Sequence, residues 1–145
     1  MLEDIKIDKE YFDSDYRIFY EDLDIAWRAN KFGWKAFFVP GALAYHVRGQ
    51  TVRSKVGVNK KYARFYLSDD LQFDLLKNRY LTIIKNESLV GFVLHLPFII
   101  LYDVLAWCYF LIFRFKSLGK VIMLKEVFKS ALKKRKAIKD KLNKI

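Results

Sequence analysis

The feature that most constrains the fold is a long apolar run, LVGFVLHLPFIILYDVLAWCYFLIF, at residues 89–113. It has 25 residues and is interrupted only by His95, Pro97 and Asp103. A membrane-spanning helix needs about 20 apolar residues, and a central Asp costs roughly 2.5–3.5 kcal/mol, which neighbouring apolar residues offset. We therefore predict a membrane-associated helix over residues 89–115. A helix buried against other protein fits the same pattern and remains the alternative.

Basic residues flank this run on both sides, with Lys77, Arg79 and Lys85 before it and Arg114, Lys116 and Lys120 after it. Positive charge normally gathers on one side of a spanning helix. Charge at both ends favours a re-entrant or interfacial helix over a single span.

Residues 116–145 predict a basic amphipathic helix. One helical stripe is apolar and lysines cover the rest; the stripe consists of Val121, Leu124, Phe128, Ala131, Leu132, Ile138, Leu142 and Ile145. Such a helix binds an anionic membrane surface, where each nearby Lys or Arg contributes about 1 kcal/mol. The alternative is a solvated helix that packs on its own domain.

The positive charge of the chain is concentrated in this tail. Residues 114–145 contain twelve Lys and Arg against Glu126 and Asp140, so they carry +10 of the net +11. Phe128 is the tail's only aromatic residue after Phe115, which argues against a base-stacking surface for nucleic acid. The single cysteine, Cys108, excludes an internal disulfide and fits a reducing, cytoplasmic setting.

Acidic residues gather near the other end, and Glu21, Asp22 and Asp24 open a predicted helix over residues 20–32. Gly33 stands where a C′ glycine belongs. Two β-type runs follow, at residues 34–39 and 42–47, separated by the turn dipeptide Pro40-Gly41. Helical periodicity returns over residues 61–86. These signals predict an α+β fold, a helix plus a short β-hairpin followed by a mainly helical C-terminal region.

The acidic cluster has two readings on residue chemistry alone. In one, Glu21 and Asp22 stabilise the helix start, while Asp24 pairs with Arg28 four residues later. In the other, a carboxylate at this position acts as a general base. His46, at the end of the second β-type run, then supplies an imidazole to a divalent metal.

The order of residues from 12 to 49 resembles the acceptor-side segment of family 2 glycosyltransferases, especially bacterial rhamnosyltransferase-like members. The matching positions are Phe12-Asp13, Tyr20, Glu21-Asp22, Asp24, Arg28, Gly33-Trp34, Pro40, Ala42 and His46. A later R-N…K-N pattern is similar to Lys77-Asn78-Arg79 and Lys85-Asn86. With the apolar and basic C-terminal region, the resemblance covers roughly residues 1–140. It favours the functional reading of the acidic cluster.

The resemblance implies a catalytic role for the cluster. Asp22 matches the base that takes a proton from the acceptor hydroxyl, and Glu21 and Asp24 orient the acceptor or Arg28. Arg28 and Trp34 are the expected acceptor-binding residues. His46 matches the ligand that completes a Mg²⁺ or Mn²⁺ site in some members, where the metal stabilises the leaving diphosphate.

The resemblance also implies that the nucleotide sugar is bound by another part of the enzyme. Family members carry a nucleotide-binding half ahead of this segment, and no Gly-rich βαβ pattern of that kind is found here. We expect residues 1–60 to be an incomplete, acceptor-side part of a GT-A glycosyltransferase domain and residues 61–88 to be a connecting helix. The expected function is transfer of a hexose or deoxyhexose from a nucleotide sugar to a lipid-linked or polysaccharide acceptor, at the cytoplasmic face of the cell membrane. The alternative is a non-enzymatic membrane-associated protein whose basic tail binds anionic lipid.

Overall fold

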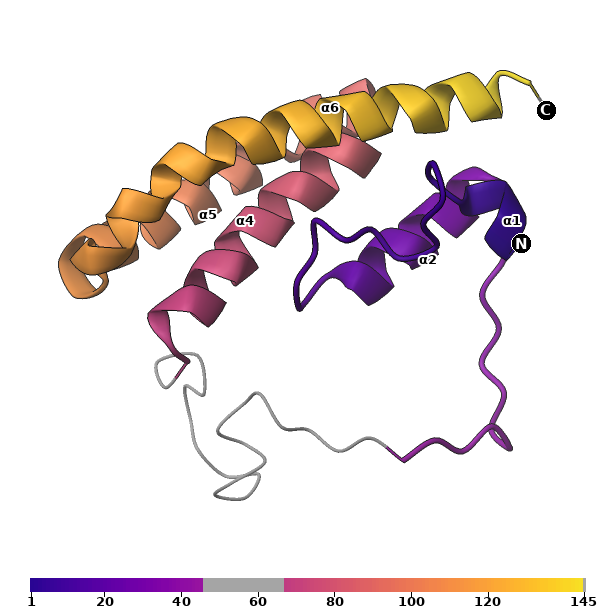
Figure 1. The fold of residues 1–145 in the computed structure, drawn as a ribbon, viewed down its shortest axis with the longest axis horizontal. Coiled ribbons are helices and arrows are strands. Elements are labelled where there is room, and N and C mark those ends of the chain that lie inside the picture. Colours follow the sequence, from indigo (N-terminus) through magenta and orange to yellow (C-terminus); the bar gives the residue numbers. More distant parts are fainter. Residues whose placement is uncertain (46–66, 145) are drawn as a thin grey trace.

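The computed structural model describes residues 1–45 and 67–144, and this part of the chain is mostly α-helical (Figure 1). Two short elements form the N-terminal part, and three long helices joined by tight connections form the rest. In chain order the elements are α1 (Leu2–Ile5), α2 (Glu21–Lys31), α4 (Asp69–Asn86), α5 (Leu89–Phe113), the 3₁₀ helix η2 (Phe115–Val121) and α6 (Ile122–Leu142).

Helix α4 is the centre of the structure. Helix α6 lies along α4, and α5 runs beside α4 in the opposite direction (Figure 1). Phe73 and Leu76 of α4, Phe110 of α5 and Leu124 of α6 form the largest buried apolar cluster. A second cluster joins Tyr16, Leu81 and Ala131, and thereby attaches the N-terminal segment to α4 and α6.

Serine caps define where the two central helices begin. The Ser68 hydroxyl accepts the backbone N–H of Leu71 at 3.4 Å, and the Ser88 hydroxyl accepts that of Gly91 at 2.9 Å. A side-chain oxygen in this position satisfies an N–H that has no partner within the helix. Helix α5 covers residues 89–113, the bounds of the apolar run in the sequence.

Helix α2 ends as its sequence predicts. Gly33 adopts a φ of +81°, its N–H donates to the Asn30 carbonyl at 3.0 Å, and the Trp34 N–H donates to the Ala29 carbonyl at 3.0 Å. This pair of bonds is the Schellman motif, which favours glycine because side chains resist a positive φ.

The predicted α+β fold is wrong for the described residues, which contain no strand. A turn does form at Pro40-Gly41, where the Ala42 N–H donates to the Val39 carbonyl at 3.0 Å. The flanking residues of the expected hairpin form no ladder up to Tyr45, and the last two, at 46–47, lie outside the described residues. An isolated two-stranded hairpin is marginal in water, and Phe37 and Phe38 have no described surface to pack against.

The apolar stripe of the C-terminal helix faces the protein. Leu124, Ala131 and Ile138 are buried, and Val127 and Phe128 pack against the α4 clusters. Leu132 is an exception, since it lies exposed beside the lysines. The structure thus agrees with the alternative expectation for this helix, in which it packs on its own domain.

Candidate functional site

The acidic cluster follows a strained turn of the backbone. Phe19 and Tyr20 have φ values of 70° and 71°, in the left-handed region that non-glycine residues rarely adopt. The amide of Asn78, on α4, donates to the Ile18 carbonyl at 2.6 Å and to the Phe19 carbonyl at 2.9 Å. Residues held this way each cost on the order of 1–3 kcal/mol and cluster at functional sites. Asn78 therefore stabilises the conformation from which α2 begins.

Asp22 and Glu21 occupy the first turn of α2. Asp22 is exposed, and its carboxylate accepts the backbone N–H of Leu23 at 2.7 Å. Glu21 is partly buried, and its Oε2 is buried without a hydrogen-bond partner among the described residues. Negative side chains in the first turn interact favourably with the positive end of the helix dipole.

Asp24 lies on the opposite, fully buried side of this turn. Its carboxylate accepts hydrogen bonds from Arg28 Nε at 3.0 Å and Asn86 Nδ2 at 2.7 Å, and it pairs with Lys85 Nζ at 2.7 Å. The predicted Asp24–Arg28 pair is thus confirmed.

Arg28 is fully buried as well, and it joins α2 to the start of the chain. Its guanidinium donates to the Ile5 carbonyl and, at 2.6 Å, to the Tyr11 carbonyl. The structure therefore places Asp24 and Arg28 in supporting positions, where neither side chain is exposed to a bound acceptor.

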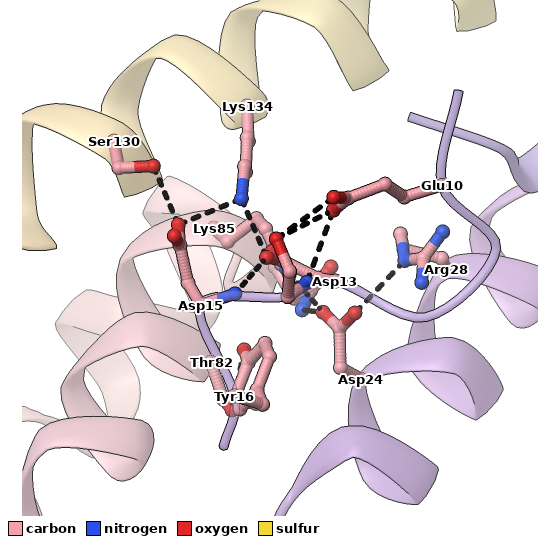
Figure 2. A network of polar contacts seen from close by, with 12 residues as sticks. Glu10, Asp13, Asp15, Tyr16, Asp24, Arg28, Thr82, Lys85, Ser130 and Lys134 are labelled. Atoms are coloured by element: carbon pink, nitrogen blue, oxygen red, sulfur yellow. Dashed lines mark hydrogen bonds and ion pairs between the residues drawn. The ribbon is translucent and has the colours of Figure 1, made fainter. Parts of the chain in front are cut away.

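A second carboxylate shares the Lys85 ammonium group and extends the network (Figure 2). Asp13, from the loop ahead of α2, lies 2.5 Å from Lys85 of α4 and 2.5 Å from Lys134 of α6. Lys134 also reaches Asp15 at 2.7 Å, and Ser130 donates to Asp15 at 2.5 Å. Three carboxylates (Asp13, Asp15, Asp24) meet three cations (Arg28, Lys85, Lys134), so the network is balanced in charge.

Burial and charge oppose each other at these groups. Burial by itself raises the pKa of Asp13, but the ammonium groups of Lys85 and Lys134 outweigh it and hold that pKa below its ordinary value. Burial likewise lowers the pKa of Lys134, but bonds to Asp13 and Asp15 outweigh it and raise that pKa. The phenol of Tyr16, buried beside Asp24, has its pKa raised and remains neutral. A buried ion network of this kind keeps its charges only while every partner is present.

Trp34 lies beyond the other end of α2. It is 45% exposed, and its indole N–H donates to Asp4 at 3.0 Å. The structure therefore separates Trp34 from the carboxylates at the start of the same helix. His46 lies outside the described residues.

The described residues do not fit the predicted divalent metal. Among them, no group of three or more His, Cys, Asp and Glu side chains is placed to hold an ion. Asp13, Asp15 and Asp24 are neutralised by Lys and Arg. Of the three predicted catalytic carboxylates, Asp22 and Glu21 have no such cation partner among the described residues. The metal remains a prediction that depends on His46 and on groups outside this part of the chain.

Sequence reasoning gave no role to the polar residues of α4 and α6 that complete the network. The signal was present in α4, where Asn78, Thr82, Lys85 and Asn86 recur at helical spacing. No comparable signal singled out Lys134 among the many lysines of α6.

Comparisons of the chain with models of known protein families, with curated proteins and with solved structures found no match.

Proposed function

We propose that the chain is the acceptor-side part of an inverting glycosyltransferase of the family 2 type, acting at the cytoplasmic face of the cell membrane. The observation that supports this is the arrangement around Asp22. Residues that match the family pattern in order (Asp13, Asp24, Arg28, Asn78, Lys85 and Asn86) converge on the start of α2, where they are buried. Asp22, which matches the catalytic base, projects to solvent from that rigid support.

In this proposal Asp22 removes the proton from an acceptor hydroxyl. The hydroxyl oxygen attacks the anomeric carbon of the donor sugar, and the bond from that carbon to the nucleoside diphosphate breaks with inversion. A base must lie within hydrogen-bond reach of the hydroxyl, and an exposed carboxylate at a helix start meets this requirement. In this proposal Glu21 orients the acceptor, whereas Asp24 and Arg28 act as positioning residues.

The nucleotide sugar is bound, in this proposal, by a nucleotide-binding half that is not among the described residues. The acceptor is a glycan or a lipid-linked sugar, and the divalent metal of the family belongs with the donor. We expect no transfer by residues 1–145 alone.

The test is a transfer assay on the assembled enzyme. The chain is expressed together with a nucleotide-binding half, either fused to it or supplied as a separate polypeptide, and membranes are supplied with radiolabelled nucleotide hexoses and deoxyhexoses. General-base catalysis contributes roughly 10²- to 10⁴-fold, so Asp22→Asn should reduce incorporation into lipid or polysaccharide by about this factor. Binding of the nucleotide sugar should stay unchanged.

Asp70→Asn is the matched control, because Asp70 is also an exposed second residue of a helix. It should leave transfer near the wild-type rate. Transfer by Asp22→Asn at the rate of this control would contradict the proposed role. Absence of transfer from every donor, with nucleotide binding intact, would contradict the glycosyltransferase assignment itself.

A second candidate function is a non-enzymatic membrane-associated protein whose basic tail binds anionic lipid. The exposed apolar surface of α5 beside the lysines of α6 favours it. The same assay separates the two candidates, since this one predicts that the chain binds membranes but that no sugar is transferred from any donor.

A further inference from the structure

Helix α5 has two faces with different surroundings. Its inner face contacts α4: Asp103 pairs with Arg79, the Trp107 indole donates to the Tyr80 hydroxyl at 3.0 Å, and Phe110 is buried. Its outer face is exposed and apolar along the helix, at Val90, Val93, Phe98, Leu101, Val104 and Ile112. The most apolar 18-residue stretch of α5, which does not include Phe110, contains no buried residue in the described structure.

The second half of the inner face contacts α4, and the start of α5 lies near α6. Near the end of α5, Arg114 pairs with Asp69 at 2.7 Å, and near its middle Asp103 pairs with Arg79. Near its start, Leu89 and Phe92 line a hollow with Leu132 and Arg135 of α6. Residues 89–102, the mostly exposed first half of α5, are fewer than the roughly 20 that a membrane span needs. The part of α5 that is not packed on α4 is therefore too short to cross a bilayer alone.

A spanning orientation of α5 would carry those neighbours into hydrocarbon. On α4, Asp74 pairs with Arg17 and Lys85 pairs with Asp13. On α6, Lys134 belongs to the same buried network. Charged groups at the bilayer centre are strongly disfavoured, and so is the loop backbone from which Asp13 reaches this network. An orientation in the membrane plane avoids both costs, since only the outer face of α5 leaves water.

We infer that α5 is an in-plane membrane anchor, with its outer face in the lipid interface and its inner face on α4. The inference rests on the membrane association within the proposed function and is independent of sugar transfer. A bilayer is the occupant that fits, because the helix bearing this face is 25 residues long and the tail carries +10. At the end of the helix the exposed aromatics Phe113 and Phe115 adjoin Arg114 and Lys116. Apolar, aromatic and basic groups in this order are found where a helix meets an anionic membrane interface.

Sidedness provides the first test. Single cysteines are placed just outside the two ends of the helix, as Ser88→Cys and Lys116→Cys, in a Cys108→Ser background. Each full-length variant is added to sealed vesicles of phosphatidylcholine and phosphatidylglycerol, and a membrane-impermeant maleimide is added outside. Both ends should react at similar rates. Protection of one end until the vesicles are lysed would overturn the inference in favour of a span.

Depth provides the second test. Nitroxide labels at Val93, Leu101 and Ile112, spread along the outer face, should all lie at one shallow depth, about 5–10 Å below the headgroups. Collision with oxygen and with a polar nickel reagent measures these depths. A central label that is clearly deeper than the two others would overturn the in-plane orientation.

A matched pair of substitutions tests the face itself. Phe98, on α5, is 71% exposed and Phe37, in the irregular segment after α2, is 80% exposed. Phe98→Glu should weaken partition to the anionic vesicles by roughly tenfold or more, whereas Phe37→Glu should change it less than about twofold. Equal effects, or no binding of the wild-type chain in flotation, would overturn the anchor. Neither outcome bears on sugar transfer, which is measured separately.

Discussion

Lys85 is the residue whose loss the buried network should tolerate least. Its side chain is fully buried, and its ammonium group lies 2.5 Å from Asp13, 2.7 Å from Asp24 and 4.5 Å from the centre of the Tyr16 ring. In Lys85→Met the apolar stem is nearly conserved in volume. The change is therefore electrostatic, since three carboxylates, of which Asp13 and Asp24 are buried, are left with two cations.

The expected cost follows from this imbalance. Breaking a buried ion pair by removing one partner destabilises a protein by about 3–5 kcal/mol, because the remaining charge stays buried and unpaired. Asp24 keeps Arg28 and Asn86, and Asp13 keeps Lys134, which places the expected loss toward the lower end, about 3 kcal/mol. Urea unfolding followed by far-ultraviolet circular dichroism in mild detergent measures it.

Two further variants make the test discriminating. Lys129→Met removes an exposed lysine that pairs with Glu126, and it should change the free energy of unfolding by less than about 1 kcal/mol. The double variant Lys85→Met/Asp13→Asn restores equal numbers of positive and negative groups, so it should recover about 1 kcal/mol or more relative to Lys85→Met. If Lys85→Met is as stable as Lys129→Met, the reasoning from buried charge is refuted.

Two further predictions concern the same region. The pKa of Asp13 is held below its ordinary value of 3.8, so its ionisation stabilises the fold above that pH, and this contribution is lost as the pH falls through the folded-state pKa. Acid unfolding followed by circular dichroism should therefore show a shallower loss of stability in Asp13→Asn than in wild type, and an unchanged slope would contradict this. Asn78→Ala removes both bonds to the turn before α2 and should destabilise the protein by roughly 1–3 kcal/mol, whereas the exposed Asn143→Ala should cost much less. Equal unfolding midpoints for the two variants would show that the turn does not depend on Asn78.

Local signals predicted the helices well. The apolar run specifies α5 because Ser88 caps its first turn and Arg114 follows its last apolar residue. Gly33 predicts the end of α2 because only glycine adopts the required positive φ without strain. The pairing of Asp24 with Arg28 follows from helical spacing alone.

The same local signals do not predict long-range contacts. The contact of Asp13 with Lys134 joins positions 121 residues apart, and nothing in the local sequence distinguishes Lys134 from its neighbouring lysines. The expected hairpin failed for a related reason, since strands are stabilised by packing partners that a local pattern does not reveal. Local sequence also did not predict that Asp22 is exposed while Asp24, two residues later, is buried.

The shared contact of Lys134 with Asp13 and Asp15 also has a consequence for the order of assembly. In a chain synthesised from its N-terminus, both carboxylates leave the ribosome long before α6, and α5 precedes Lys134 as well. The loop ahead of α2 must remain incompletely paired until α6 has been synthesised. Folding of this loop is therefore completed by α6, after the apolar helix has already been exposed to its surroundings.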